Sequence, residues 1–368
     1  MKSFEYGDEI ISSKEFMIAL PSMVIGVGVL SLPRDIASNT IGSDGWVALL
    51  VAGGISLVMI WLMAKLAAKF PRQSFLSYAS IIVSKPIAMF ISFLFAISYL
   101  CIVAYDIRVL GHTSQQYLFD NTPVEIVTLI FLFVVVYGVS GSRAAIFRLN
   151  VLFLPIILFI ALFVLTANLK WLDISNLMPA FNTDLKGHLK AIHASSLSYI
   201  GMSIVLFYIA FVDKPKKAPK LAMIGMLIPV GMYILVYSIC LLVFGHTATS
   251  HLLYPTLDLA KRIELPGGIL ERVEALFFVV WTMSVFTTAV MSFDIAILAL
   301  NSIFKRIKKM QLIFILSPLC YYIGLIPKDT IQLNVFGNIL GTYMFSFVFF
   351  ITISLSIIAK IRRVKSNG

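Results

Sequence analysis

Four ionisable residues lie inside long apolar stretches of the sequence: Asp106, Arg108, Glu125 and Asp294. A charge in such a setting is costly, so each one is by default a candidate for function. Asp106 is the strongest candidate, because its depth suits contact with a ligand ammonium or with a file of water molecules. It lies two residues from Arg108, so the two side chains point to different helix faces and do not pair. Asp294 is equally well explained as a buried structural partner of Arg143 or Arg148.

The first apolar stretch contains residues that weaken a continuous helix. Pro21 removes a backbone donor, and Gly26 and Gly28 flank Val27 near the middle of the stretch. Glycines also allow membrane helices to pack closely, and from this stretch alone the two interpretations are equally favoured. A later stretch is interrupted at similar depth by five small residues, namely Ser195, Ser196, Ser198, Gly201 and Ser203.

Signatures of enzymes and of metal sites are missing from the sequence. It has no GxSxG, HExxH or phosphate-binding loop, and its three cysteines lack partners at metal-ligand spacing. Glu271 and Glu274 flank Arg272, but acidic residues at the start of a helix need no catalytic explanation. We therefore expect neither an enzyme nor a bound cofactor.

The composition explains which elements must position these residues. Of 368 residues, 60% are hydrophobic and only 13% are charged, which excludes a water-soluble globule. A helix needs about 20 mainly apolar residues to span a bilayer. By that measure the sequence predicts an all-α membrane protein with ten transmembrane helices, at about residues 13–37, 44–66, 86–117, 123–139, 143–168, 190–212, 219–245, 271–303, 310–326 and 331–359.

The distribution of Lys and Arg predicts the orientation of these helices. If the ten segments alternate in direction, 20 of the 29 Lys and Arg residues fall on the side of the N-terminus and 9 on the other side. Cations are retained on the cytoplasmic side of a membrane, so both termini are expected to be cytoplasmic. The net charge of +11 thus reflects topology, and we expect no nucleic-acid partner.

Ten spans in a single domain of residues 1–368 divide into two halves of five, about residues 13–168 and 190–359. An odd number of spans in each half makes the halves an inverted repeat, in which the two interrupted segments are the first and sixth helices. A matched pair of interrupted helices is the best sequence pointer to a transporter binding site. Their free amides and half-helix dipoles suit a carboxylate, so an amino acid or a similar small zwitterion is the expected ligand.

The sequence resembles the amino acid–polyamine–organocation superfamily and, within it, the endospore germination permeases, the B subunits of nutrient germinant receptors. The resemblance covers nearly the whole chain in size and number of spans. It includes the Gly26-Val27-Gly28 break, Phe70-Pro71, Asn176-Leu177-Met178-Pro179, and Glu271-Arg272-Val273-Glu274 leading to Trp281. It implies a two-fold inverted-repeat fold in the spore inner membrane, working with a larger A subunit and a C-subunit lipoprotein, in contact with membrane lipid.

The resemblance also implies a ligand pocket between the first, third, sixth and eighth helices. Position along each helix assigns to it Ile25, Gly26, Val27, Gly28, Tyr99, Val103, Asp106, Ser198, Tyr199, Ile200, Gly201, Met283 and Thr287. For Val103, Ile200 and Met283, ordinary helix packing is the favoured alternative.

Sodium-coupled members of the superfamily use hydroxyls of the eighth helix together with carbonyls of the first. Thr287 and Thr288 fall where such ligands are expected, although hydroxyl pairs are also ordinary contacts between membrane helices. Some proton-coupled members carry a lysine in the fifth helix, where this chain has only Arg148, at the cytoplasmic end.

The sequence leaves two functions open. A third possibility is a membrane scaffold in which the pocket is vestigial. The first function is a nutrient-sensing receptor subunit in which the ligand favours one conformation. The alternative is an ion- or proton-coupled amino-acid transporter with the same fold.

Overall fold

The computed structural model describes residues 10–119, 121–263 and 272–363. Within these residues the chain is helical apart from turns and one isolated bridge between Ile11 and Val212. Glu271, which the sequence analysis names, lies outside them. The α-helices are α1 (Ser13–Val24), α2 (Gly28–Ala37), α3 (Gly45–Ala67), α4 (Phe75–Ile82), α5 (Lys85–Tyr117), α6 (Val124–Ser140), α7 (Arg143–Ala167), α8 (Leu185–Ala194), α9 (Ser196–Tyr199), α10 (Val205–Tyr208), α11 (Ala218–His251), α12 (Pro255–Lys261), α13 (Val273–Ile303), α14 (Lys309–Gly324) and α15 (Thr330–Ile361).

These helices confirm a multi-pass membrane protein. Six of them are long and apolar enough to cross a bilayer, and two bent pairs raise the number to eight. Each of the ten predicted segments coincides with a helix or a bent pair. However, α6 and α14, with 17 and 16 residues, are shorter than a full span, so ten crossings are not established.

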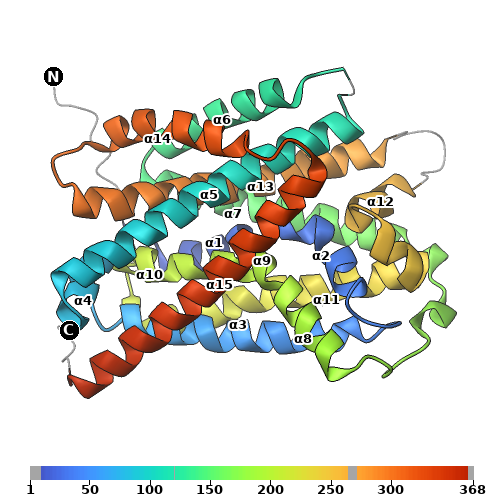
Figure 1. Ribbon diagram of the computed structural model, residues 1–368, viewed down its shortest axis with the longest axis horizontal. Helices are drawn as coiled ribbons and strands as arrows, with labels where there is room; N and C mark the ends of the chain where they lie inside the picture. The colour runs from blue at the N-terminus through green and yellow to red at the C-terminus, as the bar shows by residue number, and fades with distance from the viewer. Residues whose placement is uncertain (1–9, 120, 264–271, 364–368) are drawn as a thin grey trace.

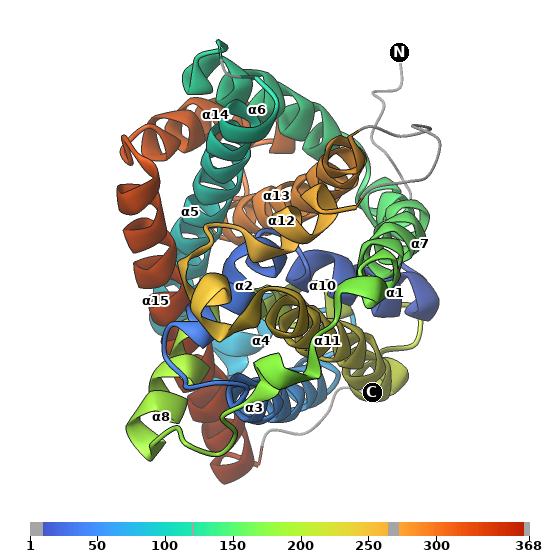
Figure 2. The ribbon, with the colours of Figure 1, turned by 90° about the vertical axis from the view of Figure 1, so that its right-hand side faces the viewer.

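The outer surface of the bundle is apolar, as a lipid-facing surface must be. Tyr137 and Phe133 on α6 are 82% and 62% exposed, and Phe350 on α15 is 67% exposed. A soluble protein seldom exposes aromatic residues so continuously. By contrast, α13 is enclosed by its neighbours and packs along α5 through the middle of the molecule (Figures 1 and 2).

Parts of both bent pairs lie at the centre of the bundle. Figure 2 shows α2 and α10 surrounded by α3, α5, α7, α11 and α13, whereas α8 lies at the edge. The start of the first helix is tied to the end of the sixth, because the Ile11 amide donates to the Phe211 carbonyl and the Asp213 amide donates to the Ile11 carbonyl, both at 2.9 Å. Ser12 and Glu15 then form a capping box that begins α1.

Two features differ from the sequence prediction. The short helix α4 was not predicted, because its eight residues are too few for a span and their apolar face is recognised only when it packs against α5. The seventh segment extends beyond residue 245 to His251, because Gly245 adopts a φ of +76° and lets a second helical segment continue at an angle.

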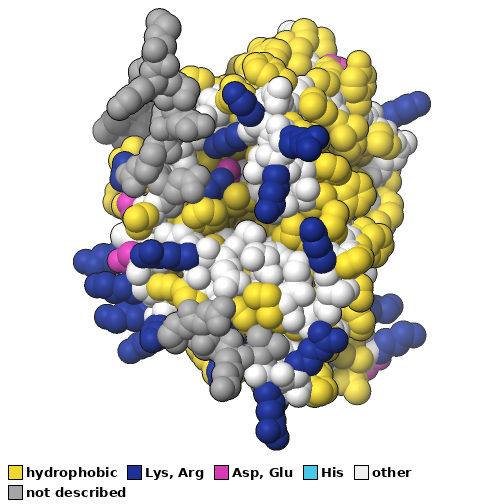
Figure 3. Space-filling view, turned by 90° about the vertical axis from the view of Figure 1, so that its left-hand side faces the viewer, with side chains coloured by type: hydrophobic (Ala, Val, Ile, Leu, Met, Phe, Trp, Pro, Cys, Tyr) yellow, Lys and Arg dark blue, Asp and Glu magenta, His cyan; other side chains and the backbone are white. Residues whose placement is uncertain are grey.

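Lys and Arg gather at one end of the molecule (Figure 3). In Figure 1 this is the left-hand end, where α4 lies and α15 ends. The opposite end holds α12 and the connection between α7 and α8.

The connection before α8 is fixed to the start of α3 by one carboxylate. Asp44 accepts hydrogen bonds from the backbone amides of Phe181, Asn182 and Thr183, at 2.8 and 2.7 Å for the last two. Burial opposes ionisation of Asp44, but these donors outweigh it and lower the pKa of the carboxyl. Asp44 thus holds the segment that leads into the sixth helix.

Candidate functional site

The first helix is broken where the sequence predicts it. The axes of α1 and α2 differ by 52°, and the residues from Ile25 to Val27 between them are not helical. The amides of Gly26 and Val27 donate to no acceptor in the described part of the chain. The break therefore leaves two backbone donors free at membrane depth, which is tolerated only where they line a cavity.

The carbonyls around this break are satisfied by side chains from other helices. The Tyr233 hydroxyl donates to the Val24 carbonyl at 2.6 Å, and the Trp281 indole N–H donates to the Gly26 carbonyl at 3.3 Å. The Thr256 hydroxyl donates to the Val29 carbonyl at 2.7 Å. Neighbouring helices thus replace the hydrogen bonds that the broken helix cannot make for itself.

The sixth helix is also broken, at the first of the five small residues that interrupt its apolar stretch. The axis bends by 46° at Ser195, between α8 and α9, and a 3₁₀ segment follows from Ile200 to Ile204. The backbone around Ser198 remains hydrogen-bonded, because its amide donates to the Ser195 carbonyl at 3.1 Å. The Ser198 amide is therefore not a free donor, unlike those of Gly26 and Val27.

Glycines bring the two broken helices into contact. A Cβ atom on Gly28 would lie 2.9 Å from the Ser198 Cα atom, and one on Gly201 would lie 2.6 Å from the Met23 carbonyl oxygen. Both distances are too short for a side chain, so this packing requires glycine at both positions.

A cavity of about 30 Å³ lies where the two broken helices meet. This volume holds one or two water molecules, so the site is closed in this conformation. The lining residues come from the first, third, sixth, eighth and last helices: Met23, Val24, Gly26, Val27, Gly28, Ile102, Tyr105, Asp106, Leu197, Ser198, Ile200, Gly201, Thr288 and Leu340.

Asp106 brings its carboxyl group to this cavity, and no cation of the described residues forms an ion pair with it. Its side chain is 3% exposed, and within the described residues Oδ2 has no hydrogen-bond partner. Arg108 points elsewhere, with its guanidinium donating to the Pro327 carbonyl at 3.0 and 3.2 Å and to Glu125 at 3.4 Å. An unpaired buried carboxylate favours a cationic partner, and the cavity is where such a partner would bind.

Seven of the thirteen predicted ligand residues line this cavity: Gly26, Val27, Gly28, Asp106, Ser198, Ile200 and Gly201. Thr288, predicted only as a cation ligand, lines it too. The predicted site therefore coincides with the cavity chiefly on the first and sixth helices. On the third helix the agreement is limited to Asp106.

The other six predicted residues lie outside the cavity: Ile25, Tyr99, Val103, Tyr199, Met283 and Thr287. Tyr99 instead donates to or accepts from the Ser203 hydroxyl at 2.6 Å, and the Tyr199 ring packs edge-on against Tyr233. Val103 is completely buried among helices, and Met283 packs against the core while partly exposed. Depth along a helix predicted these residues, but the rotation of each helix decides which side chains reach the cavity.

Six lining residues were missed by the sequence analysis: Met23, Val24, Ile102, Tyr105, Leu197 and Leu340. Two of them could have been predicted from their spacing on α5. Ile102 lies four residues before Asp106, and Tyr105 lies three residues after Ile102, so the three residues share one side of the helix. Leu340 belongs to α15, which no sequence pattern connects with the site.

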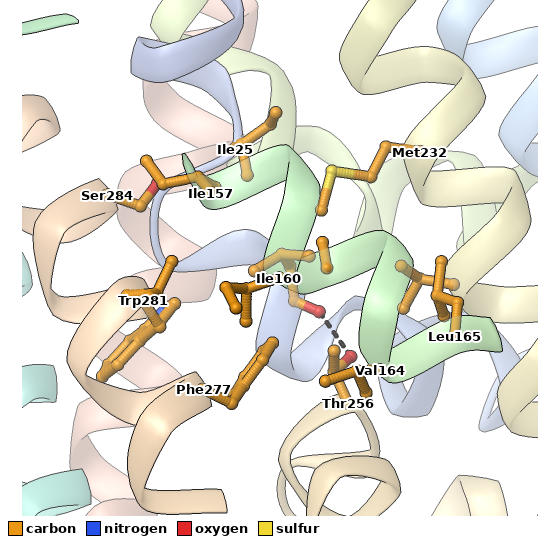
Figure 4. Close-up of a pocket in the computed structure, with 14 residues that line it drawn as sticks. Ile25, Ile157, Ile160, Val164, Leu165, Met232, Thr256, Phe277, Trp281 and Ser284 are labelled. Atoms are coloured by element: carbon orange, nitrogen blue, oxygen red, sulfur yellow. Dashed lines mark hydrogen bonds between the residues drawn. The ribbon is translucent and has the colours of Figure 1, made fainter. Parts of the chain in front are cut away.

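Ile25 lines a second, almost entirely apolar cavity of about 20 Å³ (Figure 4). It is enclosed by α7, α11 and α13, with Phe277 and Trp281 on one side and Met232 on another. The dashed line in Figure 4 is the Thr256 hydrogen bond to Val29. The broken segment therefore separates a polar cavity from an apolar one.

The hydroxyls considered as cation ligands are engaged with backbone. Thr287 donates to the Ser284 carbonyl at 2.8 Å, and Thr288 lies 3.1 Å from the same carbonyl and 3.4 Å from that of Ser22. Of these two threonines, only Thr288 also reaches the first helix, through the Ser22 carbonyl. Among the described residues there is no cluster of three His, Cys, Asp or Glu side chains that suits a metal.

Asp294 forms a buried ion pair with Arg143, which agrees with the structural interpretation in the sequence analysis. Its Oδ2 accepts from Arg143 at 2.9 Å and from the Tyr208 hydroxyl at 3.1 Å, and Lys309 Nζ lies 3.9 Å from Oδ1. At the start of the same helix, Arg272 forms an ion pair with Glu274 at 3.1 Å. Asp294 and Arg272 therefore have oppositely charged partners within the protein, and Asp294 Oδ1 accepts no hydrogen bond from the described residues.

Long apolar helices around two broken helices that meet at a closed central cavity define a membrane protein with a transporter fold. The solved structure of Mhp1, a nucleobase-cation-symport-1 family transporter with bromovinylhydantoin bound, matches with a TM-score of 0.69 and 14% identity, over 91% of this chain and 76% of that chain. MhsT in complex with L-phenylalanine matches with a TM-score of 0.66 and 14% identity, over 94% and 97%. At this identity the likeness shows the fold alone.

Residues 10–333 match the family model described as spore germination protein. The chain belongs to the spore germination protein family. It is 39% identical to spore germination protein GerLB of Bacillus cereus, over 99% of this chain and 98% of the relative. It is 28% identical to spore germination protein A2 of Bacillus subtilis (strain 168), over 92% and 93%.

Proposed function

We propose that this protein is the nutrient-sensing subunit of a spore germinant receptor, and that an amino acid or a similar small zwitterion binds where the two broken helices meet. One observation carries the proposal. The free amides of Gly26 and Val27 and the unpaired carboxylate of Asp106 all border one cavity. Amides suit a ligand carboxylate and Asp106 suits a ligand ammonium, so the cavity offers a partner to each end of a zwitterion.

Binding must widen the cavity, because about 30 Å³ cannot hold an amino acid. The ligand therefore binds a more open conformation than the one described, and shifts the equilibrium by its preference for that conformation. The contacts between Gly28 and Ser198 and between Gly201 and Met23 are the ones that must separate. In this proposal, partner subunits respond to that separation.

The proposal includes the arrangement in the membrane. It places ten crossings in two inverted halves of five, both termini in the cytoplasm, and the protein in the spore inner membrane with a larger A subunit and a C-subunit lipoprotein. Support comes from the gathering of Lys and Arg at one end of the bundle (Figure 3) and from the germination proteins among its relatives.

A coupled amino-acid transporter is the alternative function. The observation that favours it is the fold, which is shared with Mhp1 and MhsT. Thr288, which links the eighth helix to the first beside the cavity, is the one residue that also suits a coupling cation.

Two assays distinguish the functions. The first measures uptake of radiolabelled amino acids by the protein alone in liposomes, and the second measures nutrient-triggered germination of spores that carry the protein with its partner subunits. A receptor supports germination and shows no saturable concentrative uptake. Concentrative uptake by the protein without its partners would contradict the receptor proposal and support the transporter alternative.

A further inference from the structure

A large groove opens at the cation-rich end of the molecule, far from the central cavity. It has a volume of about 750 Å³ and runs between α4, the start of α5 and the turn from α13 to α14. Its polar lining consists of three cations and four hydroxyls, and no acidic residue lines it. These polar residues are Lys85, Lys305, Arg306, Ser74, Ser77, Ser80 and Ser302.

The cations of the groove have no acidic partner among the described residues. Lys85, Lys305 and Arg306 are all exposed, and none forms an ion pair there. Cytoplasmic retention explains why cations occur at this end, but it does not explain why Lys85 and the Lys305–Arg306 pair, which belong to two separate segments, border one groove. Their convergence favours an anion.

The groove also lies at the edge of the lipid-facing surface. On α5, Ile87 and Phe90 follow Lys85 within two turns and are 52% and 63% exposed. Apolar side chains line the groove as well, among them Met89 and Ile303, and Phe304 beside them is 48% exposed. Cations and hydroxyls next to exposed apolar residues match a molecule with an anionic head and an apolar tail.

We propose that this groove binds the headgroup of an anionic phospholipid. The phosphate lies among Lys85, Lys305 and Arg306, and an acyl chain runs along Met89 towards the apolar face of α5. Basic pockets between membrane helices are a known way of holding such lipids. An acidic peptide would satisfy the cations but would gain nothing from the apolar residues.

The test measures lipid retained by the purified full-length chain. The protein is exchanged into mild detergent with phosphatidylglycerol or with phosphatidylcholine, and bound lipid is counted by native mass spectrometry. The groove variant carries Lys85→Gln, Lys305→Gln and Arg306→Gln. A control variant carries Lys214→Gln, Lys216→Gln and Lys217→Gln, three exposed cations outside the groove. Size-exclusion chromatography and unfolding temperature confirm that both variants fold.

The proposal predicts that the wild type and the control retain one phosphatidylglycerol in preference to phosphatidylcholine, and that the groove variant binds it at least tenfold more weakly. Equal losses in both variants, or equal retention of both lipids, would overturn it. Two competitors test whether the groove prefers another anion. If glycerol 3-phosphate, which has no acyl chain, displaces phosphatidylglycerol completely, the groove is a phosphate site and not a lipid site. If hexaglutamate binds more tightly than the lipid, the groove is a site for an acidic peptide.

Discussion

The Tyr233 hydroxyl lies 2.6 Å from the Val24 carbonyl of the first broken helix and 3.2 Å from the Ser198 carbonyl of the sixth. A hydroxyl has a single proton, so the two carbonyls compete for it. Tyr233 therefore connects the two broken helices from α11. Any separation of these helices must change how that proton is shared.

Tyr233→Phe should destabilise the closed conformation, because two buried carbonyls lose their shared donor. The expected loss is roughly 1–3 kcal/mol in the free energy of unfolding. Thermal unfolding of the purified protein measures it. Tyr199→Phe is the matched control, since the Tyr199 hydroxyl is buried without a partner among the described residues and its removal should cost little. Equal losses in both variants would show that the hydroxyl of Tyr233 does not connect the helices.

Gly201→Ala should abolish the nutrient response. The added Cβ atom would lie 2.6 Å from the backbone carbonyl oxygen of Met23, and backbone cannot rotate away as a side chain does. The contact between the broken helices is then forced apart. Germination against nutrient concentration measures the effect, with protein level checked by immunoblot.

Gly231→Ala provides the control for this change. It lies inside α11, where an added Cβ atom meets nothing within 4 Å, so a normal nutrient response is expected. If Gly201→Ala spores also respond normally, the proposal that the sixth helix forms part of the ligand site is wrong.

The two buried aspartates should respond in opposite ways to replacement by asparagine. Asp106→Asn replaces a buried carboxyl group whose Oδ2 atom has no hydrogen-bond partner among the described residues, so stability should be unchanged or higher while the nutrient concentration for half-maximal germination rises at least tenfold. Asp294→Asn breaks a buried pair with Arg143 and should cost about 3–5 kcal/mol. Unfolding and germination assays on both variants measure this. A stable Asp106→Asn protein with wild-type nutrient sensitivity would reduce Asp106 to a packing residue.

Asp44 should contribute stability that depends on pH. Because its pKa is lowered in the folded state, the contribution is present above the pKa of the unfolded chain, near 3.9, and is lost as pH falls through the folded value. Asp44→Asn should therefore lower the unfolding temperature at pH 7, and the difference from wild type should shrink towards pH 3. A constant difference across this range would contradict the assignment.

Several parts of the fold follow from sequence because they depend on local chemistry. Pro21 and the two glycines around Val27 weaken a helix whatever surrounds it, so the first break was predicted at the right residues. In the sixth helix, the serines and Gly201 predicted a break, and its bend falls at the first of these residues, Ser195. The contact of Gly201 with Met23 is not contained in any local pattern.

The site was predicted less completely than the fold. Glycines and Asp106 stand out in any apolar stretch, whereas Leu197 and Leu340 resemble every other leucine. Tyr99 and Val103 lie at suitable depth, yet α5 is rotated so that Ile102 and Tyr105 reach the cavity instead. Helix rotation is set by packing of the whole bundle and cannot be read from one helix.

The central claim is that the nutrient binds between the broken helices, and a structure of the assembled receptor with its germinant tests it most directly. The account predicts ligand density with its carboxylate at the amides of Gly26 and Val27 and its ammonium at Asp106, in a cavity wider than the closed one. Density on another subunit, with this cavity still closed, would contradict it.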